Sequence, residues 1–125
     1  MKDGEEIKKD NFKHEIVLAI KKKNEIVAIT GCSHSGIVNM GDAVKRKFPQ
    51  FVFKSIIGGF HLSNPGTGNM TESKERVIEM AKNLKKMNIQ EIYTGHCTGK
   101  EAFGHIKSVL KEKIKPFKTG TVLEF

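Results

Sequence analysis

Residues 25–36 read EIVAITGCSHSG, a run of apolar, largely β-branched residues that leads directly into a glycine-containing loop with a histidine. The same order returns in residues 55–62, SIIGGFHL, and in residues 91–99, EIYTGHCTG. β-Branched runs of this length favour strands, and glycine allows the chain to turn sharply where a strand ends. The sequence therefore predicts three strands that each end in a loop carrying a histidine.

Strands and helices alternate around these three segments. Period-two and helical spacings of apolar residues predict, in chain order, strands over 14–20 and 25–31, a helix over 37–47, a strand over 51–57, a helix from Thr71 to near Asn88, a strand over 89–95, a helix over 102–110 and a last strand over 119–125. The KKKN turn after the first strand predicts an antiparallel hairpin. The order β-β-α-β-α-β-α-β predicts an α/β layered fold with one mixed sheet.

Length and composition are those of a small globular protein. The chain has 125 residues, of which 38% are hydrophobic and 29% charged, enough for one domain with its own core. We expect a polar N-terminal segment over 1–11 and one domain over 12–125. No apolar run approaches the roughly 18–20 residues of a membrane span, and the N-terminus lacks the apolar centre of a signal peptide. A cytoplasmic protein with no membrane partner is therefore expected.

The formal net charge of +8 raises the question of nucleic-acid binding. Arg46 and Arg76 are the only arginines, and the aromatic residues do not interleave with the lysine runs. Both facts argue against base readout or single-strand stacking. A solvated lysine-rich surface fits the distribution better. Attraction of an anionic small-molecule substrate is the second interpretation.

The three loop histidines are the candidate metal ligands. The carboxyl ends of neighbouring parallel strands meet at one edge of a sheet, so His34, His61 and His96 are expected there together. Imidazole binds zinc, manganese and iron. The predicted hairpin places His14 roughly across from Gly31, beside the same edge. A single histidine is more often an ordinary hydrogen-bonded residue, but three in the same setting favour a functional site.

The same loops suggest an anion site. Residues 95–100, GHCTGK, are one residue too short between the glycines for a nucleotide-binding P-loop. Small and hydroxyl residues before a helix can still hold one phosphate, and the candidates are Ser33, Ser35, Gly36, Thr98 and Gly99. Cys32 and Cys97 are expected to be small buried residues, because neighbouring residues rarely adopt the geometry of an activated thiolate pair.

Three motifs make the sequence recognisable: TGCSHSGIVNM at 30–40, IIGGFHLSNP at 56–65 and YTGHCTGKEA at 93–102. In this order they resemble the metallo-β-lactamase superfamily. More narrowly, they are similar to its branch of metal-dependent hydrolases that includes dihydropterin ribofuranosylaminobenzene-phosphate synthase-like proteins. The resemblance extends over about residues 10–125.

The resemblance implies an αββα sandwich with one or two metal ions, usually zinc, at one edge of its two sheets. It implies metal-assisted attack of hydroxide on the substrate. His34 and His96 match metal-binding positions, and His61 matches a ligand or a substrate contact. His14 and Glu15 match the start of a strand near the site.

One departure from the family is large. The principal metal motif, His-x-His-x-Asp-His, does not occur in these 125 residues. The chain therefore resembles the C-terminal half only, which would supply one sheet with helices on one face and an exposed apolar face on the other. Two functions follow as expectations. One is an enzyme fragment that needs a separate N-terminal half chain, and the other is a non-catalytic metal-binding or self-associating domain.

Overall fold

The computed structural model describes residues 2–3, 6–7 and 9–125. Its elements in chain order are β1 (Lys2–Asp3), β2 (Glu6–Ile7), β3 (Val17–Lys22), β4 (Glu25–Thr30), α1 (Ile37–Lys47), β5 (Val52–Ile57), α2 (Lys74–Lys86), β6 (Glu91–Thr94), η1 (His96–Thr98), α3 (Lys100–Leu110), η2 (Lys111–Lys113) and β7 (Ile114–Pro116). The polar segment expected over 1–11 lies partly outside the described residues. Within them, β1 and β2 pair with each other in a separate two-stranded sheet.

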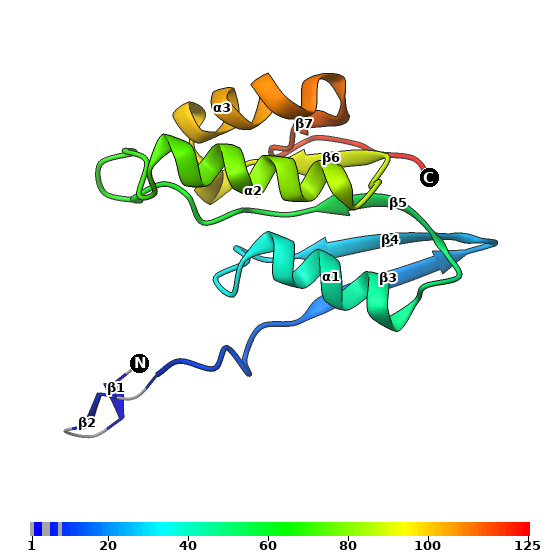
Figure 1. Cartoon of the computed structure of the whole chain (residues 1–125), viewed down its shortest axis with the longest axis horizontal. Helices are drawn as coiled ribbons and strands as arrows, with labels where there is room; N and C mark the ends of the chain where they lie inside the picture. The colour runs from blue at the N-terminus through cyan, green and yellow to red at the C-terminus, as the bar shows by residue number, and fades with distance from the viewer. Residues whose placement is uncertain (1, 4–5, 8) are drawn as a thin grey trace.

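One five-stranded mixed sheet forms the body of the molecule, in the order β3-β4-β5-β6-β7 (Figure 1). β3 and β4 form the predicted antiparallel hairpin, closed where Lys22 pairs with Glu25. β4, β5, β6 and β7 run parallel. Because the strands follow one another in sequence order, right-handed crossovers place α1, α2 and α3 on the same face. The predicted α/β layer with helices on one face is confirmed.

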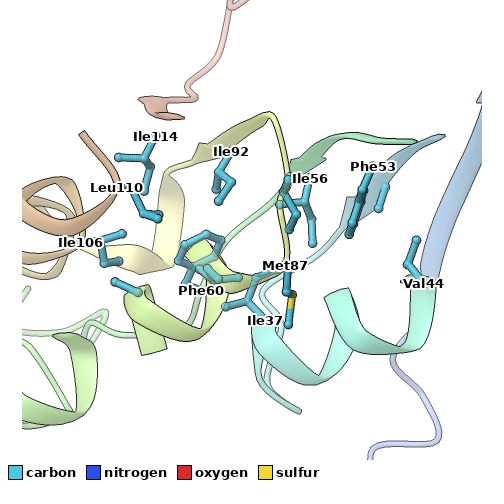
Figure 2. Packing of buried hydrophobic residues seen from close by; sticks show 14 of the residues in the cluster. Ile37, Val44, Phe53, Ile56, Phe60, Met87, Ile92, Ile106, Leu110 and Ile114 are labelled. Carbon is cyan, nitrogen blue, oxygen red and sulfur yellow. The ribbon is translucent and has the colours of Figure 1, made fainter. Parts of the chain in front are cut away.

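The core lies between this face and the helices. Its fully buried members come from strands and helices alike, as Ile56 of β5 and Ile106 of α3 are each 0% exposed. Figure 2 shows side chains of the strands, such as Ile56 and Ile92, and of the helices in one layer, with Phe60 from the loop after β5 among them. Apolar packing therefore extends from the sheet into one of the loops that follow it.

Helix α2 begins later than the sequence predicted. Its cap is Ser73, whose hydroxyl accepts from the Arg76 N–H at 3.2 Å, and Glu75 follows in the first turn. Thr71, the expected cap, instead donates its backbone N–H to the Leu62 carbonyl at 2.9 Å. That bond holds Thr71 in the preceding loop, so the chain becomes helical only after it.

The other face of the sheet differs in two ways from the expectation. The predicted last strand over 119–125 is wrong: the fifth strand is β7, and the chain then turns, with the Thr121 N–H donating to the Lys118 carbonyl at 2.9 Å. The residues beyond this turn cross the sheet face, where Leu123 and Phe125 pack on Val27, Ile57 and Tyr93. Burial of these apolar groups outweighs the ladder bonds that an added edge strand would gain.

The face is therefore covered in part. Tyr93 is 7% exposed beneath the C-terminal residues, whereas Leu18 and Ile20 of β3 remain 57% and 47% exposed. An apolar hollow of about 450 Å³ lies between Ile20, Val27, Phe117 and Phe125. Every helix that the structure describes is too short or too polar to cross a bilayer.

Candidate metal-binding site

Three loops meet at the carboxyl edge of the parallel strands, as the repeated strand-glycine-histidine pattern predicted. The loop after β5 lies between the other two and bonds to both. The Gly59 N–H donates to the Gly31 carbonyl at 2.9 Å, and the Leu62 N–H donates to the Cys97 carbonyl at 2.9 Å. The backbone of the middle loop therefore fixes the spacing of the first and third loops.

A group of three potential ligands lies across this junction. The sulfur atoms of Cys32 and Cys97 and a ring nitrogen of His96 all lie within 4.8 Å of one another. His96 is exposed and the two cysteines are partly exposed. Thiolate and imidazole are the donors that zinc prefers, and catalytic zinc sites use three protein ligands. The donor set therefore fits a zinc ion.

His34 and His61 lie in the same loops but form a different arrangement. Their rings stack with centroids 3.8 Å apart and planes inclined by 29°. The lone pairs of stacked rings run side by side in separate planes, so one ring would have to turn for both to bind one ion. In the structure as described, His34 and His61 are not part of the group of possible ligands formed by Cys32, His96 and Cys97.

The backbone is left-handed at three non-glycine positions of these loops. Ser33, His61 and His96 have φ values of 58°, 52° and 52°. L-residues adopt this conformation at a cost of about 1–2 kcal/mol, and such residues concentrate at functional sites. Two of the predicted ligand histidines are thus held in conformations that their own preferences disfavour.

Glu15 holds the first loop in place through hydrogen bonds to its backbone. Its carboxylate accepts from the His34 N–H at 2.5 Å and from the Ser35 N–H at 2.8 Å. Partial burial raises the pKa of this carboxyl, but hydrogen bonds from Ser35 and His34 outweigh it and hold the pKa below the ordinary value. His14 and Gly31 line one hollow of about 200 Å³ next to Glu15. The structure thus places His14 beside the loops, as the hairpin predicted, and Glu15 next to it, as the resemblance implied.

The residues predicted to bind an anion are tightly packed. Ser33 is 2% exposed, and its hydroxyl pairs with that of Thr30 at 2.9 Å. Thr98 is 1% exposed, and its hydroxyl accepts from the Phe60 N–H at 3.0 Å. In the first loop, where Ser35 and Gly36 precede α1, the Glu15 carboxylate already occupies two backbone donors, and an external anion would compete with it.

Gly99, the remaining predicted anion-binding residue, has a structural constraint of its own. It has a φ of +80°, and a Cβ placed there would lie 2.6 Å from the Cβ of Ser63. Gly99 therefore allows the third loop to pass close to the second. Anion binding at these five residues stays a prediction.

The cysteines are the residues that sequence reasoning misjudged. They were expected to be buried, but both are partly exposed, and the Cys97 sulfur accepts from the His61 N–H at 3.2 Å. Partial burial raises the pKa of the Cys97 thiol above its ordinary value. The hydrogen bond from the His61 N–H lowers this pKa, but by less than burial raises it. The available signal was position, since Cys32 and Cys97 stand within two residues of His34 and His96.

Fold, loops and sequence together define a class. A crystal structure of a metal-dependent hydrolase of the β-lactamase superfamily matches 87% of this chain with a TM-score of 0.75 and 29% identity, over 40% of that protein. The chain is therefore homologous to part of such a hydrolase.

Two relatives from Methanocaldococcus jannaschii are similar in sequence. One is described as 7,8-dihydropterin-6-methyl-4-(beta-D-ribofuranosyl)-aminobenzene-5'-phosphate synthase, with 35% identity over 117 residues, 93% of this chain and 37% of that protein. The second is an uncharacterised protein with 29% identity over 121 residues, 88% of this chain and 41% of that protein. The chain thus spans about two fifths of the length of these relatives. No protein-family model matches it.

Proposed function

We propose that this chain supplies the loops that bind a divalent metal ion in a metal-dependent hydrolase. The observation that carries the proposal is the convergence of Cys32, His96 and Cys97 within 4.8 Å, from loops that follow two different strands. Homology to a metal-dependent hydrolase supports it. His96 holds the ion together with the thiols, and His34 and His61 complete the same site or a neighbouring second one.

A metal ion bound there would supply Lewis-acid chemistry, polarising a carbonyl or phosphoryl oxygen of the substrate. The chain's own residues would hold the loops of this site in place and attract the substrate to it. Glu15 fixes the loop that carries His34 through two backbone hydrogen bonds. The chain's +8 charge would attract an anionic substrate, such as an organic phosphate, toward it. Zinc fits the sulfur and nitrogen donors, while manganese and iron would rely on the histidines.

Metal analysis of the purified chain tests the proposal. After loading with zinc and removal of the excess by gel filtration, the chain should retain about one ion per molecule. The double variant His34→Ala, His96→Ala should lose it. His105→Ala is the matched control, because His105 lies on α3 beside Glu101, away from the three loops. Equal zinc in the double variant and the control would reject these ligands.

Catalysis by this site would require ligands from another segment or chain carrying His-x-His-x-Asp-His. The exposed side chains of Leu18 and Ile20 offer an apolar surface on which a second sheet would pack. Mixing the chain with such a partner should give a complex that hydrolyses a phosphodiester or ester with Zn²⁺ or Mn²⁺. A failure to form any complex would contradict this part of the proposal.

A second candidate is a self-associating metal-binding domain without catalysis. The same exposed residues of β3 favour it, because two copies can bury a shared apolar patch around a two-fold axis. Light scattering separates the two cases. A dimer that Leu18→Lys converts to a monomer supports self-association, whereas a monomer at high concentration rules it out.

A further inference from the structure

The thiols of Cys32 and Cys97 face each other across the junction of two loops. Their sulfur atoms lie within 4.8 Å, and the Cys97 sulfur lies 3.7 Å from the Cys32 carbonyl oxygen, to which it donates. Both residues are partly exposed, so a small oxidant can reach them. They are the chain's only two cysteines.

The loops that carry these thiols are held together without them. Gly59 bonds to Gly31, next to Cys32, and the N–H groups of Leu62 and Ser63 both donate to the Cys97 carbonyl, at 2.9 and 3.0 Å. A Cβ at Gly59 would lie 2.5 Å from the Cys97 sulfur, so the glycine keeps space open around that atom. The backbone therefore keeps the thiols near each other whatever their oxidation state.

A disulfide requires the two sulfurs to approach to about 2.05 Å. The sulfur atoms lie at most 4.8 Å apart, and rotation of the side chains about χ1 is the motion that would bring them together. The lasting proximity of the two groups gives each thiol a high effective concentration toward the other. Closure within one molecule should therefore outpace disulfide formation between molecules.

We propose that Cys32 and Cys97 form a reversible disulfide that closes the metal site to metal. The oxidant is a peroxide. One thiol attacks hydrogen peroxide and becomes a sulfenic acid with release of one water. The second thiol attacks that sulfur, forming the S–S bond and releasing another water. In total the two thiols lose two protons and two electrons, which reduce the peroxide to two waters.

The regulatory consequence rests on the proposed metal-binding function. A sulfur in a disulfide no longer offers a thiolate, so oxidation removes two of the three donors and leaves His96 alone. Conversely, a metal ion that holds both thiolates protects them from the oxidant, because binding and oxidation compete for the same atoms. A dithiol reductant restores the site by exchange.

The first test uses the full chain freed of metal and treated with equimolar hydrogen peroxide. We expect titratable thiols to fall from two to none, the intact mass to drop by two hydrogens, and a proteolytic peptide pair to join the segments of Cys32 and Cys97. Dithiothreitol should reverse all three changes. Added oxygen on separate cysteines, or disulfide-linked dimers as the main product, would overturn the inference.

The single variants Cys32→Ser and Cys97→Ser are matched controls. Each keeps one thiol, so neither can lose two hydrogens within one molecule. If either variant gives the same reversible mass change as the unaltered chain, the assigned pair is wrong.

A zinc arm separates this inference from the proposed function. Zinc added before the peroxide should slow disulfide formation at least about tenfold, as expected for an ion in large excess over its dissociation constant. If the disulfide forms at the same rate with and without bound zinc, the thiols do not hold the ion and the regulatory inference fails. If zinc binds but no disulfide forms in its absence, the proposed function stands and the inference fails.

Discussion

The two faces of the sheet are built from the same strands but finished to different degrees. On the helical face, Ile56, Ile106 and Ile114 are each fully buried within one apolar cluster. On the other face, C-terminal residues alone cover a smaller cluster of Val27, Ile57 and Tyr93 in the described part of the chain, and Leu18 and Ile20 remain exposed. The first face therefore contributes more to the stability of the fold, and the second has apolar surface that remains exposed.

Polar groups sharpen the contrast. Ser55 is 0% exposed, and its register against Val27 places it on the face with the smaller cluster. Its hydroxyl is buried without a hydrogen-bond partner among the described residues. On the same face the Tyr93 hydroxyl donates to Glu91 at 2.9 Å. Thr94 follows Tyr93 on β6 and so points to the helical face, where its buried hydroxyl pairs with that of Thr98 at 2.5 Å.

The largest expected effect comes from the helical face. Ile106→Ala should lower the free energy of unfolding by about 2–5 kcal/mol, because it opens a cavity in a closely packed layer. Leu18→Ala, on the other face, should change it by no more than about 0.5 kcal/mol. Urea denaturation of both variants measures the difference. Similar losses of unfolding free energy in the two variants would mean that both faces contribute equally to stability.

Removal of the C-terminal cover should have an intermediate effect. The double variant Leu123→Ala, Phe125→Ala should cost about 1–2 kcal/mol, since both side chains are only partly buried. It should also increase self-association in light scattering, because Val27 and Ile57 become exposed. Val122→Ala is the control, since Val122 is 84% exposed. An equal loss in the control would contradict specific packing by the cover.

The buried hydroxyl provides a smaller test with an unusual sign. Ser55→Ala should leave stability unchanged or raise it by up to about 1 kcal/mol, because it removes a buried polar group that has no partner. Thr98→Val is the contrasting variant, since Thr98 accepts from the Phe60 N–H and should lose about 1–3 kcal/mol. Thermal unfolding distinguishes them, and a marked loss in Ser55→Ala would show that this hydroxyl does find a partner.

The smallest effect concerns acid stability. The hydrogen bond from Tyr93 holds the pKa of Glu91 below its ordinary value of 4.5. A lowered pKa stabilises the fold above the unfolded-state value, and this contribution is lost as the pH falls through the folded-state pKa. Tyr93→Phe should therefore reduce the loss of stability between pH 7 and pH 3, by under about 1 kcal/mol at this partly exposed carboxylate.

The ring contact of Tyr93 with Phe125, with centroids 6.5 Å apart, makes phenylalanine the conservative choice for that test. Melting curves at the two pH values provide the comparison. An unchanged difference between them would assign the acid sensitivity to other groups.

The order of strands and helices could be predicted from sequence because apolar spacing and strand-end glycines report local structure directly. The end of the chain could not, since TVLEF reads as a strand by composition alone. Its place was decided by apolar surface on Val27 and Ile57, which only the assembled sheet presents.

A similar limit applied to the site. The strand-glycine-histidine pattern predicted that His34, His61 and His96 lie at the carboxyl edge of the sheet, and the structure places them there. The pattern could not predict the directions of the side chains. The stacking of His34 on His61 and the approach of Cys32 to Cys97 depend on how the three loops bond to one another. Positions in sequence predicted the neighbourhood, and backbone hydrogen bonds decided the partners.

The left-handed residues of the loops also limit which replacements this site tolerates. At Ser33, His61 and His96 a valine or isoleucine would clash with its own backbone before any question of chemistry arose. Asparagine, aspartate and glycine are the replacements that such a backbone accepts most readily. Substitutions at these positions are therefore restricted to a few small or polar residues. Two of them, asparagine and aspartate, also carry oxygen donors suited to metal ions.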